Sequence, residues 1–469
     1  MSTDFVREQL ALGMGHAPAA EMGLRDAAAS ENKALPIHRW VPWIAGFSAQ
    51  FVEDAIAAYL PKTGRRRHTV LDPFAGVGTT LVETIKAGHD AIGYEINPFA
   101  VLATSAKLKC LEVQPEDFRA EVDAFRSALS RFEAEVDRRW LEGGEGGLAD
   151  IAGDLAPTRP QGFKSRIPFF SPPVEAKFLY ALTRTRTLLE PDRTLFRCAL
   201  GATMVSFSNY SYEPSLGSRP GSGKPLIENA SVALPVCRKL QEMLTDVEWA
   251  RQNYGYRWLS QRREIFQASY FEAPLAPGSV SLVVTSPPYM NNYHYVRNTR
   301  PQLYWLGLLS EGDRPQDLEQ SSFGKFWQTV RQGHPVHLEL DDPEVSALVE
   351  KLRATNVERG YYGGPGWANY VATYLNDSDR FMMMLKKQLR PGGHAVIVIG
   401  NSIIQGIEFA VDRWLVRMAE RHGLKPEETR IVRTKRVGNS IIDSSVRNGD
   451  ENGHRGKTQL YDAAVVLRR

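Results

Sequence analysis

The hydrophobic and polar positions of the chain predict two groups of β-strands with a long helical stretch between them. Apolar runs rich in β-branched residues predict buried strands, which we place at 68–72, 90–95, 264–268, 280–285 and 394–400, with two more near 429–434 and 461–467. Between 111 and 263 helical spacing replaces this pattern, as in Phe118, Val122, Phe125, Leu129 and Phe132. Strands that alternate with helices predict an α/β fold with a mostly parallel sheet.

The same patterns divide the chain into parts. Residues 1–34 are small, polar and weakly periodic, and we expect a flexible arm or a short helix there. Residues 35–110 and 264–469 carry the predicted sheet, and 111–263 form an inserted helical region. A smaller, charged insertion with a glycine-rich exit spans 310–365.

A glycine turn follows the first predicted strand, in the string Asp72-Pro73-Phe74-Ala75-Gly76-Val77-Gly78-Thr79-Thr80. Gly76 and Gly78 permit a tight turn and close approach of a ligand to the backbone. Glu95 ends the second strand about twenty residues later, where Rossmann-type folds place a carboxylate on ribose hydroxyls. The third glycine of a dinucleotide fingerprint is missing, because Leu81 stands in its place.

A stiff turn, Ser286-Pro287-Pro288-Tyr289, follows the strand that ends at Thr285. Prolines have no N–H, so the turn offers acceptors, namely Ser286 Oγ and the carbonyls of Ser286 and Pro287, beside the Tyr289 ring. These groups suit a planar ligand that carries an NH₂ group. The alternative is that Ser-Pro-Pro only begins a helix, as at Ser171, where no β-branched strand precedes it.

The string from Thr285 to Tyr289 resembles the catalytic motif of the amino-methylating DNA methyltransferases, which act on cytosine N4 or adenine N6. The Asp72–Thr80 string resembles the S-adenosylmethionine loop of the same family, and Gly93–Pro98 resembles its second-strand motif. This resemblance implies a class I methyltransferase fold, a Rossmann-like, mostly parallel sheet with helices on both faces, here with a largely helical insertion.

The resemblance also implies roles for residues. Catalysis would rest on Ser286, Pro287, Pro288 and Tyr289. S-adenosylmethionine would be bound by Asp72, Pro73, Phe74, Ala75, Gly76, Gly78, Thr79, Thr80, Glu95, Ile96, Asn97, Ser269, Tyr270 and Thr285. Ser269 stands where the family usually has an acidic or small polar residue near the adenine. No metal is required.

Methyl transfer to cytosine N4 in duplex DNA, with the target base flipped out of the helix, is the function that these motifs favour. Serine ahead of Pro-Pro-Tyr is commoner among the cytosine enzymes of the family. Adenine N6 remains an alternative, as does an RNA or small-molecule amino methyltransferase with the same turn, or a nucleic-acid-binding protein without activity. Neither insertion is covered by the resemblance, so we assign target recognition to 111–263 by elimination.

Composition adds modest limits. A net charge of +3 is too small to argue for nucleic acid by itself, although basic residues cluster at 65–67 and 430–436. Three widely spaced cysteines form neither a metal pattern nor a disulfide framework, which predicts a reducing cytoplasm. None follows a proline, as the catalytic cysteine of cytosine-C5 enzymes does. No segment is long and apolar enough to predict a membrane span.

Three segments carry further expectations. Residues 37–52 would either line the methionine end of the cofactor or pack as aromatic core. The basic loop 217–225 lacks the spacing of a phosphate loop and suits DNA contact, with an ordinary surface loop as the alternative. Duplex DNA is the expected partner, joined by a cognate restriction endonuclease if the enzyme serves a restriction-modification system.

Overall fold

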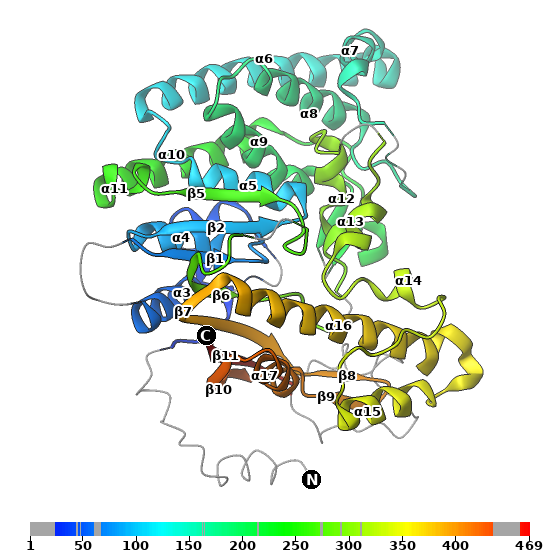
Figure 1. Cartoon of the computed structure of the whole chain (residues 1–469). Helices are drawn as coiled ribbons and strands as arrows, with labels where there is room; N and C mark the ends of the chain where they lie inside the picture. The colour runs from blue at the N-terminus through cyan, green and yellow to red at the C-terminus, as the bar shows by residue number, and fades with distance from the viewer. Residues whose placement is uncertain are drawn as a thin grey trace.

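A seven-stranded sheet forms the centre of the protein in the computed structural model (Figure 1). The structure describes residues 24–43, 46, 48–60, 67–161, 163, 165–212, 215–272, 275–290, 293–309, 312–434 and 460–469. The sheet order is β10-β11-β7-β6-β1-β2-β5, and β11 alone among these strands runs antiparallel to its neighbours. The strands are β1 (Thr69–Asp72), β2 (Asp90–Glu95), β5 (Arg263–Gln267), β6 (Val280–Thr285), β7 (Leu389–Gly400), β10 (Lys425–Thr434) and β11 (Tyr461–Arg468). The predicted α/β fold is therefore confirmed.

Helices cover both faces of this sheet, which explains why all residues of β6 are buried. Val70 and Leu282 pack on one face with α3 (Ala49–Tyr59), whereas Leu71 and Val283 pack on the other face. That other face is covered by α16 (Gly364–Gln388) and α17 (Val411–Arg421). The glycine turn leads from β1 into α4 (Thr79–Lys86), and α5 (Pro98–Leu108) follows β2.

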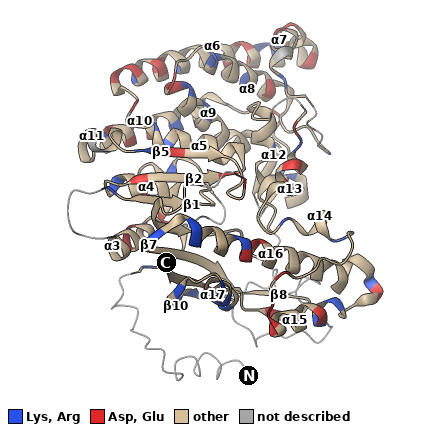
Figure 2. Ribbon diagram, viewed as in Figure 1, with Lys and Arg blue, Asp and Glu red and all other residues tan. Residues whose placement is uncertain are grey.

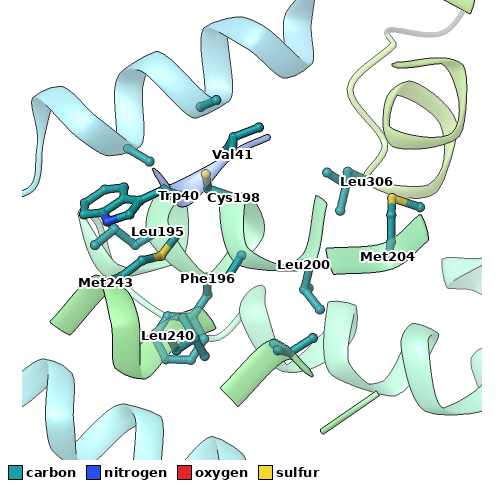
Figure 3. Close-up of a cluster of buried hydrophobic side chains, with 14 of the residues drawn as sticks. Trp40, Val41, Leu195, Phe196, Cys198, Leu200, Met204, Leu240, Met243 and Leu306 are labelled. Carbon is teal, nitrogen blue, oxygen red and sulfur yellow. The ribbon is translucent and has the colours of Figure 1, made fainter. Parts of the chain in front are cut away.

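A helical layer lies beyond the β5 edge of the sheet (Figure 1). It consists of α6 (Pro115–Gly147), α7 (Ala149–Leu155), α8 (Pro172–Thr185), α9 (Asp192–Thr203), α10 (Ala233–Asn253) and α11 (Tyr256–Leu259). Phe118, Val122, Phe125 and Leu129 of α6 are buried as the spacing predicts. Figure 3 shows part of this core, where Leu195 and Phe196 of α9 lie near Leu240 and Met243 of α10.

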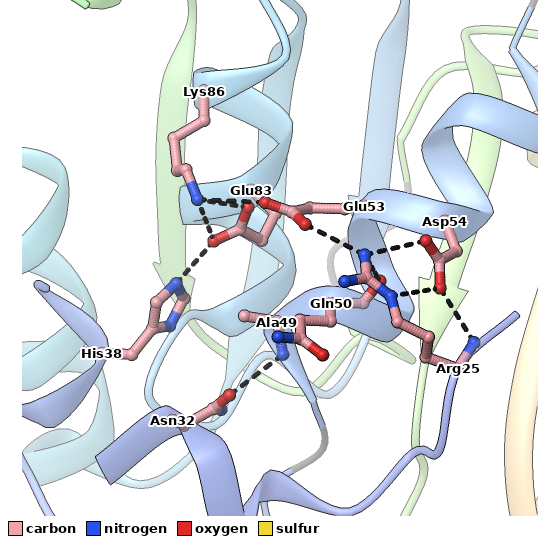
Figure 4. A network of polar contacts seen from close by, with 9 residues as sticks. All are labelled: Arg25, Asn32, His38, Ala49, Gln50, Glu53, Asp54, Glu83 and Lys86. Carbon is pink, nitrogen blue, oxygen red and sulfur yellow. Dashed lines mark hydrogen bonds and ion pairs between the residues drawn. The ribbon is translucent and has the colours of Figure 1, made fainter. Parts of the chain in front are cut away.

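The short segment Ile37–Val41 joins the helical layer to the sheet domain. Asp246 of α10 accepts hydrogen bonds from the Ile37 N–H at 2.7 Å, from Trp40 Nε1 at 2.8 Å and from the Arg39 guanidinium at 2.5 Å. His38 lies on the opposite side, with Nε2 2.6 Å from Glu83 of α4, in a network that continues to Lys86 (Figure 4). The segment therefore bonds to both parts of the molecule.

The second insertion folds against α16. It contains α13 (Pro315–Ser321), α14 (Trp327–Val330), α15 (Pro343–Arg353) and η6 (Val357–Tyr362). Two small hairpins complete the described structure, β3 (Tyr210–Tyr212) with β4 (Leu216–Ser218), and β8 (Ser402–Ile404) with β9 (Ile407–Phe409). The expected basic loop 217–225 thus begins in β4, whose Leu216 N–H bonds to Asn298 of α12 (Tyr295–Trp305) at 2.9 Å.

Some predicted element boundaries differ from the structure. α6 has a kink at Gly144 and ends at Gly147, and α16 begins at Gly364, inside the glycine-rich exit predicted for the smaller insertion. Residues 1–23, residues 435–459 and parts of both basic clusters lie outside the described residues. Lys and Arg are interspersed with Asp and Glu over the part shown in Figure 2. Within the described ranges, every helix is too short or too polar to cross a membrane.

Candidate active site

A pocket opens where the carboxyl ends of β1, β2, β5 and β6 meet. From β1 the strand order proceeds to β2 and β5 on one side, and from β6 it proceeds to β7 on the other side. The order therefore reverses between β1 and β6, and open α/β sheets bind ligands at such a switch point. The predicted site residues that line this pocket are Pro73, Phe74, Ala75, Gly76, Thr79, Glu95, Ile96, Asn97, Ser269, Tyr270, Ser286, Pro288 and Tyr289. The structure thus brings together most of the residues that the two motifs supplied.

The glycine turn is held from behind by α5. Gly76 and Gly78 have φ of +52° and +81°, a region that favours glycine. Thr104 Oγ1 donates to the Gly76 carbonyl at 2.9 Å, and Lys107 Nζ donates to the Val77 carbonyl at 2.8 Å. Burial lowers the pKa of Lys107 to about 8. These bonds occupy the turn's carbonyls, so the turn approaches the pocket with a fixed shape.

Glu95 places a carboxylate on the pocket wall. Its oxygens accept hydrogen bonds from the Gly76 N–H at 2.9 Å and the Asn97 N–H at 2.8 Å. Burial raises the pKa of this carboxyl from 4.5 to about 7. A half-buried carboxylate next to a glycine turn has the acceptor chemistry that paired ribose hydroxyls need.

Several predicted residues lie behind the wall instead of on it. Asp72 is fully buried, and its Oδ1 accepts from Thr285 Oγ1 at 2.6 Å and from the Phe74 N–H at 3.0 Å. Burial raises the pKa of Asp72 to about 6. Thr80 Oγ1 donates to the Val284 carbonyl at 3.2 Å. Asp72, Thr80 and Thr285 therefore brace β1 against β6 under the turn, and Gly78 and Pro287 also stand outside the lining.

An aromatic slot forms the pocket end beyond β5. Phe74 packs edge-on against Phe323 with ring centroids 5.1 Å apart, and Phe271 stacks near the same ring at 6.1 Å. Tyr270 beneath them donates its hydroxyl to Gln388 Oε1 at 2.5 Å. No local pattern pointed to Phe323, because it belongs to a charged insertion without a motif.

The Ser286–Tyr289 turn is fixed by groups from distant elements. The Tyr374 hydroxyl of α16 donates to the Pro288 carbonyl at 2.8 Å, so this carbonyl is engaged within the protein. The Tyr289 hydroxyl hydrogen-bonds with Ser286 and with Asp462 of β11. Burial, followed by the nearby Asp462 carboxylate, raises the pKa of Tyr289 well above 10. Ser286 Oγ remains as the side-chain acceptor that this turn offers at the pocket.

The wall opposite the turn comes from α12 and the second insertion. His294 Nε2 lies 3.1 Å from Glu319, and its Nδ1 accepts from the Arg297 N–H at 3.1 Å. Burial lowers the pKa of His294 to about 4, so the ring is neutral at pH 7 and donates from Nε2 to Glu319. No site residue was predicted in 310–365, whereas Glu319 and Phe326 line the pocket.

The 37–52 segment contributes to both the pocket and the core, through different residues. Trp43 lines the pocket, and a Cβ on Gly76 would lie 3.4 Å from its Nε1. Trp40 and Val41 instead pack into the helical core, where Figure 3 labels them.

The sheet order with its one antiparallel strand, together with a pocket at the switch point, defines a class I methyltransferase fold. Residues 29–106 match the family model of the N6- and N4-directed enzymes, described as DNA methylase. The chain is 24% identical over 430 residues to the type II methyltransferase M.BsoBI of Geobacillus stearothermophilus, covering 87% of this chain and 82% of that protein. It is 23% identical over 467 residues to the type II methyltransferase M.AvaI of Nostoc sp., covering 93% and 87%. These matches support the relationship to the amino-methylating DNA methyltransferases that the motifs predicted.

Proposed function

We propose that the protein transfers the methyl group of S-adenosylmethionine to the exocyclic N4 of cytosine in duplex DNA. One observation supports this proposal most strongly: the Gly76–Glu95 half and the Ser286–Tyr289 half line one continuous pocket. The similarity to M.BsoBI and M.AvaI, both type II methyltransferases, supports a modification enzyme of a restriction-modification system.

The residues present fit S-adenosylmethionine. Glu95 would accept hydrogen bonds from the ribose hydroxyls, the Gly76 turn would lie against the cofactor, and the Phe74, Phe271 and Phe323 rings form an apolar slot of the kind that an adenine ring fills. When bound, the cofactor supplies an electrophilic methyl group. The target amine would be the nucleophile for this methyl group, and it would release one proton to water.

The protein's own part is to orient the target amine. Its lone pair is delocalised into the base, and an acceptor on one N–H favours a geometry in which the lone pair points at the methyl group. Ser286 Oγ, which lines the pocket, is the acceptor proposed for this role, with the base stacked on the Tyr289 ring. Extrusion of the base from the duplex would bring it into the space between this turn and the His294 wall.

Adenine N6 and single-stranded RNA are the competing substrates, because their amines have the same chemistry. The serine ahead of Pro-Pro-Tyr favours cytosine. The test is incubation of the purified protein with labelled S-adenosylmethionine and unmethylated genomic DNA, followed by digestion to nucleosides and mass spectrometry. We expect N4-methylcytosine with the wild type and loss of about 100-fold or more of the product with Ser286→Ala, since an acceptor used in the transition state is removed.

The matched control is Ser171→Ala, which changes the other Ser-Pro-Pro, at the start of α8, and is expected to retain wild-type activity. N6-methyladenine as the product would identify adenine as the target base and leave the proposed mechanism unchanged. Cofactor binding without labelled DNA would refute the DNA proposal, and labelled RNA in a parallel reaction would identify the substrate.

A further inference from the structure

The carboxylate of Asp462 meets the catalytic turn from β11, which is separated from β6 by β7 alone. Asp462 lies in β11, is 5% exposed and pairs with Gly400 across the β7–β11 ladder. A Cβ added to Gly400 would lie 3.0 Å from Asp462 Oδ1 and 3.0 Å from Tyr289 Cε2. The glycine therefore leaves room for the tyrosine ring and the carboxylate to meet at this point.

Hydrogen-bond chemistry fixes the direction of the chain from Asp462 to Ser286. A carboxylate only accepts hydrogen bonds, so the Tyr289 hydroxyl must donate to Asp462. Its oxygen is then an acceptor for the Ser286 hydroxyl, which bonds to it. Because the Ser286 proton points at Tyr289, the free lone pairs of Ser286 Oγ can accept a hydrogen bond from a ligand. Ser286 lines the pocket, so such a ligand can reach it.

Burial and the neighbouring carboxylate hold the pKa of Tyr289 well above 10, so its hydroxyl keeps the proton that this direction requires.

We propose that Asp462 is a positioning residue that acts through the Tyr289 hydroxyl to make Ser286 an acceptor for the target amine. The inference rests on the proposed function. A serine hydroxyl can donate as well as accept, and a donor aimed at the amine nitrogen would engage the lone pair that must attack the methyl group. An acidic residue in the place of Ser286 would need no such control, because an ionised carboxylate cannot donate.

The chain offers a matched control for this proposal. Asp412 of α17 is also buried, at 6% exposure, and accepts a hydrogen bond from the Tyr461 hydroxyl at 3.1 Å. Neither Asp412 nor Tyr461 lines the pocket. Asp412→Asn therefore disturbs a comparable buried Asp–Tyr pair without touching the catalytic turn.

The experiment compares Asp462→Asn, Tyr289→Phe, the double variant and Asp412→Asn in full-length protein. Measured are kcat and KM for DNA methylation, S-adenosylmethionine affinity by calorimetry, and thermal stability. An asparagine amide can donate to Tyr289, which would reverse the chain and turn the Ser286 proton towards the amine. We expect kcat to fall about 10-fold or more in Asp462→Asn and in Tyr289→Phe, the scale of a lost charge-assisted hydrogen bond. Cofactor affinity should stay within about twofold, as neither change removes a cofactor contact.

Non-additivity gives the sharpest readout. If both single changes break the same chain, the double variant loses no more than the worse single variant. The role of Asp462 would be overturned if the losses in kcat multiplied in the double variant. An unchanged kcat in Asp462→Asn, or an equal loss of kcat in Asp412→Asn, would overturn it as well. A wild type that binds cofactor and methylates no DNA would instead overturn the proposed function, and the inference with it.

Discussion

Two carboxylates at the strand ends show how burial divides similar side chains between support and binding. Asp72 and Glu95 both have a raised pKa, to about 6 and about 7. Asp72 is fully buried and bonded to Thr285, whereas Glu95 reaches the pocket wall. The first therefore holds two strands together, and the second is available to a ligand.

Glu95 predicts opposite effects of pH on stability and on cofactor binding. Its folded pKa of about 7 lies above the ordinary 4.5, so the folded protein takes up a proton between these values. This group thus stabilises the fold as pH falls from 7 towards 4.5. Cofactor affinity should instead fall in that window, because a protonated carboxyl accepts ribose hydroxyls poorly. Calorimetric titration from pH 8 to pH 5.5 measures the affinity, and Glu95→Gln should remove the pH dependence. A Gln variant with the wild-type pH profile would contradict this assignment.

Residues that follow a predicted strand could be found from the sequence, and residues brought in by topology could not. Gly76, Glu95 and Ser286 each lie at the end of a predicted strand or within a few residues after it, and they line one pocket. Tyr374 and Asp462 reach the same site from α16 and β11. Their approach depends on the order of strands in the sheet, which no local pattern specifies.

At the scale of elements, the junction of the glycine turn with α4 is the most constrained part of the site. Gly78 is the N-cap of α4, and a Cβ there would lie 2.8 Å from Thr104 Cγ2. Thr104 is the residue that holds the Gly76 carbonyl. A side chain at position 78 would therefore disturb the turn through α5.

Gly78→Ala and Gly88→Ala make a matched pair, because both glycines have positive φ, +81° and +90°. A Cβ on Gly88 meets only Gln261 Nε2, at 3.9 Å. We expect Gly88→Ala to lower the free energy of unfolding by about 1 kcal/mol, the cost of the left-handed conformation, with cofactor affinity unchanged. Gly78→Ala should lower it by about 3 kcal/mol, because overpacking adds to the strain, and should weaken cofactor binding. Urea denaturation and calorimetry measure both effects, and equal losses in the two variants would contradict the proposed contact.

The start of α16 shows why glycine misled the prediction of element boundaries. Gly364 and Gly366 belong to the glycine-rich exit that was predicted to end the insertion before the helix. In the structure a Cβ on Gly364 would lie 2.0 Å from the Leu352 carbonyl, and one on Gly366 would lie 2.0 Å from the Tyr361 carbonyl. These glycines serve close packing of the helix against its neighbours, a contact that the sequence does not reveal. Pro365, at the first turn of the helix, was the local signal for its start.

At the scale of the whole molecule, the Ile37–Val41 segment fixes the helical layer on the sheet domain. Its donors converge on Asp246, whose side chain is 1% exposed. The helical layer was predicted from periodicity, but its attachment could not be, because the bonded residues are 209 positions apart.

Asp246→Ala should lower the free energy of unfolding by about 3 kcal/mol, because the buried Ile37 and Trp40 donors lose their partner. Urea denaturation measures the change. The control on the same helix is Glu248→Ala, which removes an exposed pair with Arg119 and should cost at most about 0.5 kcal/mol. Similar costs for the two variants would show that the segment is not the attachment.

This attachment has a consequence for synthesis on the ribosome. Ile37 leaves the ribosome 209 residues ahead of its partner Asp246, and Asp72 leaves 213 residues ahead of Thr285. The nascent amino-terminal part must therefore wait, with its apolar segment uncovered, until the helical layer and then β6 have been made. Trp40 is covered only then, and the Gly76–Glu95 side of the pocket is completed only when the Ser286–Tyr289 turn follows β6.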